Sequence, residues 1–145
     1  MVQYWIYLLN EEVAGYYRNR AEKIVELLRE HKCAKAPFKN IYQKQVEFIT
    51  ERLSFSRLEL GLKEHFPGNV GKNLERNMFV LHNKNGEEAL LIVQKRRLLL
   101  VADSTSAASD ICQALAKLSP SFLAVDAHFD DYGWLTISSD GRKFA

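Results

Sequence analysis

The chain has 145 residues, of which 47% are hydrophobic and 26% are charged. This is the usual size of one domain with an ordinary core, and the composition argues against general disorder. The 20 basic and 18 acidic residues leave a formal net charge of +2, without the basic excess typical of a dedicated nucleic-acid binder. We expect a single domain over residues 1–137 and a polar C-terminal tail over residues 138–145.

The cysteines and histidines are scattered and do not form a recognisable metal site. Cys33 and Cys112 lie far apart, and the pair His31 and Cys33 is not followed by a second ligand pair. We therefore expect no metal and no cofactor. The apolar N-terminal stretch over residues 1–9 is too short to span a bilayer and lacks a basic flank, so a cytoplasmic protein is expected.

The N-terminal third predicts one strand and two helices. Residues 2–9 are apolar on both alternating faces, which is typical of a central strand covered on both sides. Asn10 can cap a helix that continues to about His31 with helical periodicity. A second helix is predicted over residues 38–52, where Gln45 projects into an apolar stripe. The apolar members of that stripe are Phe38, Ile41, Phe48 and Ile49.

The rest of the chain predicts mainly strands. Residues 54–63 alternate loosely and indicate a strand, whereas residues 66–73 are turn-rich and indicate a loop. The later predicted elements are a strand over 77–82, a hairpin over 89–93 and 98–102, a helix ending near 118, and strands over 122–125 and 132–137. The fold class is α/β (α+β), with a mixed, mostly antiparallel sheet packed with about three helices.

Two polar clusters suggest alternative functions. Asp126 and His128 follow a predicted strand and could supply a base and its orienting group, although such residues are also common in plain turns. The run Lys95–Arg97 forms the predicted hairpin tip. It could contact nucleic-acid phosphates, or it could be a solvated turn that protects a sheet edge.

The first predicted helix carries features of a protein-binding surface. On a helical wheel, Val13, Tyr16 and Arg20 lie beside the core arc, and Tyr17 lies between them and the core. Aromatic residues and arginine at the border of a buried face are typical anchors for protein partners. From the pattern alone, the plainer interpretation of Tyr17 is a core tyrosine with a satisfied hydroxyl. Gln45 must be hydrogen-bonded or must lie at an opening.

Several segments, in order and spacing, resemble the SirA family, the sporulation inhibitor of replication of endospore-forming bacteria. The matching segments are residues 4–9 (YWIYLL) with Glu11 and Glu12, then Ala14, Tyr17 and Arg20, residues 44–50 (KQVEFIT), residues 119–126 (SPSFLAVD) and residues 132–135 (YGWL). Residues 53–77 are the least alike. Because the segments span nearly the whole chain in register, the likeness concerns the entire domain.

The resemblance implies a small non-enzymatic inhibitor that binds the N-terminal domain of the replication initiator DnaA. A monomer would form a 1:1 complex and block that domain's contacts with other initiation proteins during sporulation. By position, the family's binding surface falls on Val13, Tyr17 and Gln45, to which the helical wheel adds Tyr16 and Arg20. Valine at position 13 replaces the large aromatic side chain that family members can carry, which reduces the apolar contact.

Three other functions remain open at this point. One is a nucleic-acid-binding regulator that uses Lys95–Arg97, and another is an enzyme that uses Asp126 and His128. The third is a purely structural sporulation component without a tight soluble partner.

Overall fold

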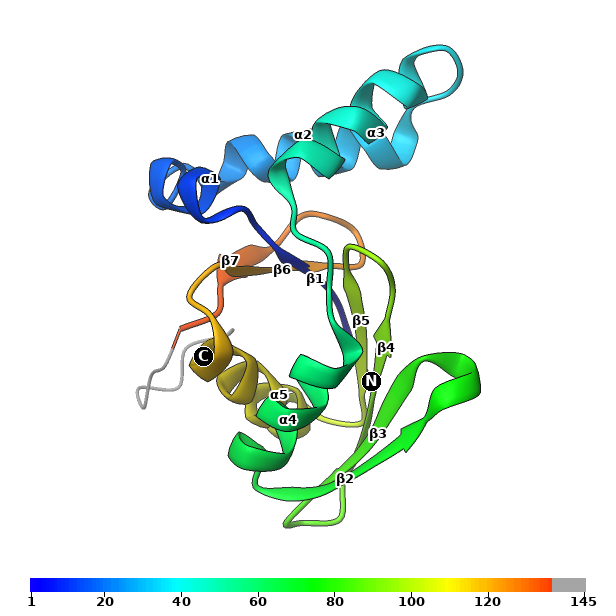
Figure 1. Ribbon diagram of the computed structural model, residues 1–145, viewed down its shortest axis with the longest axis vertical. Helices are drawn as coiled ribbons and strands as arrows, with labels where there is room; N and C mark the ends of the chain where they lie inside the picture. The colour runs from blue at the N-terminus through cyan, green and yellow to red at the C-terminus, as the bar shows by residue number, and fades with distance from the viewer. Residues whose placement is uncertain (137–145) are drawn as a thin grey trace.

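The computed structural model describes residues 1–136, which form a seven-stranded antiparallel sheet and five α-helices (Figure 1). The strands are β1 (Val2–Leu8), β2 (Gly68–Asn73), β3 (Met78–Asn83), β4 (Glu88–Val93), β5 (Leu98–Ala102), β6 (Phe122–Asp126) and β7 (Tyr132–Trp134). The helices are α1 (Glu11–Tyr16), α2 (Ala21–Cys33), α3 (Phe38–Ile49), α4 (Phe55–His65) and α5 (Thr105–Leu118), with a short 3-10 turn η1 (Leu74–Arg76).

The sheet has the strand order β2-β3-β4-β5-β1-β6-β7, so β1 is an interior strand between β5 and β6. Tyr4 pairs with Leu100 on one side and with Asp126 on the other. Ile6 and Tyr7 are both buried and belong to different core clusters on the two faces of the sheet. The prediction of a central strand covered on both faces is therefore confirmed.

Helices cover both faces of the sheet, in two separate layers (Figure 1). The larger core lies under α4 and α5, where Leu58, Leu62 and Ile111 pack against strands β3, β4 and β5. The smaller core lies under α1 and α2, where Ile24 and Leu28 pack against β1 and β6. The expected single-domain α/β class is confirmed, with five α-helices in residues 1–136 where about three were expected.

The first predicted helix is wrong in its continuity, because the chain breaks it between Tyr16 and Ala21. The turn is held from outside the helix: Arg18 donates to the Pro120 carbonyl at 2.9 Å and stacks over the Trp134 ring, 4.4 Å from its centroid. The Trp134 indole N–H donates in return to the Arg18 carbonyl at 3.0 Å. These partners lie more than 100 residues away in sequence, so helical periodicity alone could not reveal the break.

The strand predicted over residues 54–63 is wrong, since this segment forms α4. The Ser54 hydroxyl caps the helix by accepting from the Arg57 backbone N–H at 3.4 Å. Leu58 and Leu62, four residues apart, are buried against α5, whereas Leu60 is 70% exposed. Burial therefore follows the helical period, and the alternation of leucines that suggested a strand is incidental.

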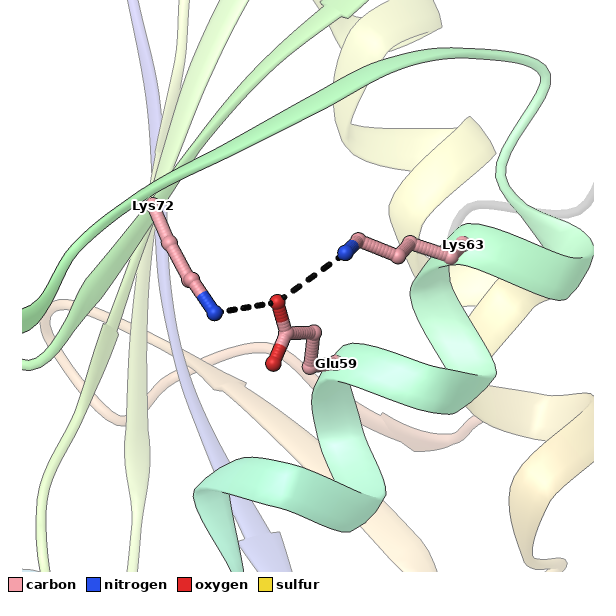
Figure 2. A network of polar contacts seen from close by, with 3 residues as sticks. All are labelled: Glu59, Lys63 and Lys72. Carbon is pink, nitrogen blue, oxygen red and sulfur yellow. Dashed lines mark ion pairs between the residues drawn. The ribbon is translucent and has the colours of Figure 1, made fainter.

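The loop predicted over residues 66–73 is also wrong, because residues 68–73 form edge strand β2, paired along its whole length with β3. Polar contacts hold this edge strand to α4. Glu59 of α4 pairs with Lys63 at 3.1 Å and with Lys72 of β2 at 2.8 Å (Figure 2). These two lysines, Lys72 first, hold the pKa of Glu59 below its usual value.

Two predicted ends differ as well. The second predicted helix ends at Ile49 rather than at Arg52, because Thr50 leaves the helix to form a β-bridge with Leu9. The last strand ends at Trp134 rather than at residue 137. Residue 137 and the predicted polar tail over residues 138–145 lie outside the described residues.

Candidate protein-binding site

The start of α1 and the end of α3 lie side by side, although they are far apart in sequence. The Asn10 backbone N–H donates to the Ile49 carbonyl at 2.7 Å, and the Glu51 N–H donates to the Leu8 carbonyl at 2.7 Å. This pairing follows directly from the Leu9–Thr50 bridge. It brings Val13, in the first turns of α1, close to the C-terminal half of α3, which carries Gln45.

The α1 side of this site presents two tyrosines in different environments. Tyr16 is 72% exposed, whereas Val13 and Tyr17 are half-buried and pack against the smaller core. The two tyrosine rings meet edge to face, with centroids 4.8 Å apart and an interplanar angle of 70°. Arg20 is exposed and lies beyond the helix break, at the N-cap of α2.

The apolar stripe of α3 faces outward instead of lining a core. Phe38, Ile41 and Phe48 are 62%, 53% and 79% exposed, and Ile49 is half-buried. The buried side chain of this helix is Val46, which packs in the smaller core beside Ile49. Gln45 is exposed between Ile41 and Phe48. Gln45 was expected either to be hydrogen-bonded within the core or to lie at an opening, and its exposure supports the second alternative.

We call the side chains of Val13, Tyr16, Tyr17, Ile41, Gln45 and Phe48 the α1–α3 surface. It combines exposed aromatic and aliphatic groups with an amide and a phenol, which can form hydrogen bonds around an apolar centre. Large exposed apolar side chains such as Ile41 and Phe48 are typical of protein-binding surfaces. The periodicity identified the helix that carries Ile41 and Phe48 but could not tell an outward stripe from a buried one.

The tip of the β4–β5 hairpin also fixes the position of α3, a role that the sequence did not predict for its basic residues. Arg96, at the tip of the β4–β5 hairpin, donates to the Glu47 carbonyl at 3.0 Å and to the Thr50 carbonyl at 2.8 Å. The last turn of α3 has no basic residue of its own, so Arg96 supplies the missing cation at its negative end. The basic run is therefore largely engaged within the chain, and Lys95 is its exposed member.

Asp126 and His128 sit in a tight turn between β6 and β7. The Asp126 carboxylate accepts from the Asp130 backbone N–H at 2.9 Å, and Phe129 adopts a left-handed conformation with φ 60°. Phe129 is buried, and its carbonyl accepts a hydrogen bond from Arg29. The Asp126 side chain thus has a turn-forming role, as its residue type favours.

The described part of the chain contains no group of three or more His, Cys, Asp or Glu side chains arranged to hold a metal ion. His31 instead lies 2.6 Å, through Nε2, from the Gln43 side-chain oxygen and links α2 to α3. None of the helices within residues 1–136 combines the length and apolar character that crossing a bilayer requires.

Comparison with known proteins finds relatives over almost the full length of the chain. The family profile described as "Sporulation inhibitor of replication protein SirA" matches residues 2–138. The chain is also similar to the sporulation inhibitor of replication protein SirA of Bacillus subtilis (strain 168), with 26% identity over 135 residues, covering 91% of each chain. A family match over residues 2–138 shows that the chain belongs to the SirA family of sporulation inhibitors of replication.

Proposed function

We propose that this protein inhibits the initiation of DNA replication during sporulation by binding the N-terminal domain of the initiator DnaA. The family membership supports the coarser part, inhibition of replication in sporulating cells. The outward-facing α1–α3 surface supports the finer part, action through a protein partner. In this proposal the protein works in the cytoplasm, without catalysis, as a monomer in a 1:1 complex.

The single observation that carries the proposal is the exposure of the α3 stripe beside α1. Phe48 is 79% and Ile41 is 53% exposed, and both flank Gln45. Leaving these groups in water costs the free protein hydrophobic free energy that a partner would recover. A central apolar cluster with polar groups around it is the usual form of a protein–protein interface.

Within this interface we assign separate roles to the residues. Val13 and Tyr17, one helical turn apart, press into an apolar depression on the partner, and exposed Tyr16 extends this contact. The Tyr17 hydroxyl and the Gln45 amide form hydrogen bonds at its edge, and Arg20 supplies a charge at the rim. Valine at position 13 offers less apolar area than an aromatic side chain would, and Phe48 adds area on the neighbouring helix.

The proposal is tested by isothermal titration of the purified chain with the isolated N-terminal domain of DnaA from the same organism. Saturable binding at a 1:1 ratio, with co-elution on gel filtration, supports it. The absence of both heat and co-elution contradicts it. A parallel titration with a plain DNA duplex at two salt concentrations separates the alternative of a nucleic-acid-binding regulator, which would bind with a steep salt dependence.

A further inference from the structure

A pocket of about 340 Å³ lies between the β4–β5 hairpin tip and the α2–α3 pair. Gln43 and Glu47 of α3 line it, one helical turn apart, whereas Gln45 points to the opposite side of the helix. The pocket is therefore separate from the α1–α3 surface. Its volume lies at the lower end of the range for small-molecule sites.

Arg97 stands at the wall of this pocket in a fixed orientation. Its guanidinium lies 3.7 Å from the centroid of the Trp5 ring, and its Nε donates to the Gln94 side-chain oxygen at 2.8 Å. One terminal nitrogen donates to the Tyr7 hydroxyl at 3.3 Å. Within residues 1–136 no carboxylate forms a salt bridge with this half-buried cation. The remaining guanidinium donors are thus free to bind an anion, at a reduced entropic cost.

Tyr7 contributes a second donor from the floor of the pocket. Its side chain is only 4% exposed, yet the residue lines the pocket. The hydroxyl accepts from Arg97 and can still donate its own proton, because a phenol is both donor and acceptor. Burial raises the pKa of Tyr7, against the smaller opposing effect of Arg97, so the hydroxyl remains protonated at neutral pH.

The rim is more basic than acidic. Lys95 and His31 border the pocket in addition to Arg97. The acidic residue of the rim is Glu47, whose carboxylate accepts from the Gln43 amide at 2.9 Å. A pocket with this balance attracts a small anion and, because of Glu47, disfavours one of very high charge.

We propose that this pocket binds the oxyanion group, phosphate or carboxylate, of a small molecule. Arg97 and the Tyr7 hydroxyl hold the oxygens by direct hydrogen bonds, and Lys95 adds a mobile positive charge at the entrance. The hydrogen-bonded His31 and Gln43 bridge closes the far wall, between α2 and α3. Because the site lies across α3 from Gln45, an occupied pocket leaves the α1–α3 surface free. The inference therefore does not depend on the identity of the protein partner.

The test is a titration of the full chain with three separate probes: inorganic phosphate, AMP and succinate. Two-dimensional NMR follows the Trp5 indole N–H, which reports on the stacked Arg97, and isothermal titration gives the affinity. We expect saturable one-site binding with a shift of the Trp5 signal. Binding of phosphate and AMP but not succinate identifies a phosphate site, and the reverse identifies a carboxylate site.

Two variants and one control decide whether the binding occurs in this pocket. Arg97→Gln should weaken the binding of the active probe by about tenfold or more, because a charged hydrogen-bond donor is lost. Tyr7→Phe keeps the buried ring and should weaken binding several-fold by removing only the hydroxyl. Arg57→Gln, exposed on α4 on the other face of the sheet, should leave it unchanged. No saturable binding of any probe, or equal binding by all three variants, would overturn the proposal.

Discussion

The position of α3 depends on one arginine that comes from the hairpin rather than from the helix. In the variant Arg96→Met, two hydrogen bonds to the Glu47 and Thr50 carbonyls are lost while much of the apolar side-chain stem is kept. We expect this substitution to lower the free energy of unfolding and to loosen the last turn of α3.

The size of the effect follows from the contacts. Each lost hydrogen bond contributes about 1 kcal/mol, since one acceptor is part-buried and the other exposed. A cation at a helix C-terminus adds about 0.5 kcal/mol. The expected loss is therefore about 2.5 kcal/mol, which corresponds to a fall in Tm of roughly 5–10 °C for a domain of this size.

Urea unfolding followed by circular dichroism measures this loss, with the midpoint expected to fall at an unchanged m value. Lys95→Met is the matched control, because Lys95 is the exposed neighbour on the same hairpin tip and makes no comparable contact to α3. It should change stability by less than about 0.5 kcal/mol. Equal effects of the two substitutions would refute the role given to Arg96.

Three further predictions concern other parts of the molecule. Phe48→Ala should weaken DnaA binding, measured by calorimetry, by about 2 kcal/mol, roughly thirtyfold in Kd, without loss of stability. The control Leu60→Ala changes a residue that is 70% exposed on α4 and should leave the affinity unchanged. Equal affinities of the two variants would contradict the interface. Glu59→Gln should lower Tm at pH 7, because a lowered folded pKa of Glu59 contributes stability at pH values above its usual pKa of about 4.3. The difference in Tm from wild type should vanish as the pH falls through the lowered folded pKa of Glu59. A difference that persists at pH 2 would exclude the ion pair as its cause. Ellman's reagent should modify one thiol of the native chain, that of exposed Cys33, and both thiols after unfolding. Cys112 should be unreactive in the folded protein because burial raises its pKa to about 12. Rapid reaction of both thiols in the folded protein would show that Cys112 is accessible.

Local patterns were sufficient for much of the fold. Strand β1, the β4–β5 hairpin and α5 were predicted because each has an apolar pattern bounded by capping or turn residues. The region from α4 to β2 was predicted wrongly, because its short leucine series fits both the helical period and the alternating period of a strand. Its structure is decided by contacts between distant elements, such as the ion pair of Glu59 with Lys72.

The candidate site was predictable in composition but not in arrangement. The sequence pattern and the family resemblance singled out Tyr17 and Gln45, and in the structure the Leu9–Thr50 bridge joins the start of α1 to the end of α3. The break before α2 could not be predicted, because Arg18 and Trp134 are 116 residues apart. The exposure of Phe48 was also hidden, since an amphipathic pattern does not reveal whether its apolar face is covered.

The most direct test of the central claim is the affinity for the N-terminal domain of DnaA, measured by titration for wild type, Tyr17→Ala and Tyr132→Ala. Tyr132 is a matched tyrosine, 37% exposed on β7. Circular dichroism first establishes that each variant is folded, since Tyr17 also packs against the smaller core. The account predicts tight 1:1 binding for wild type and Tyr132→Ala, with a loss of about 2 kcal/mol or more for Tyr17→Ala. Unchanged affinity of a folded Tyr17→Ala variant would contradict the proposed interface.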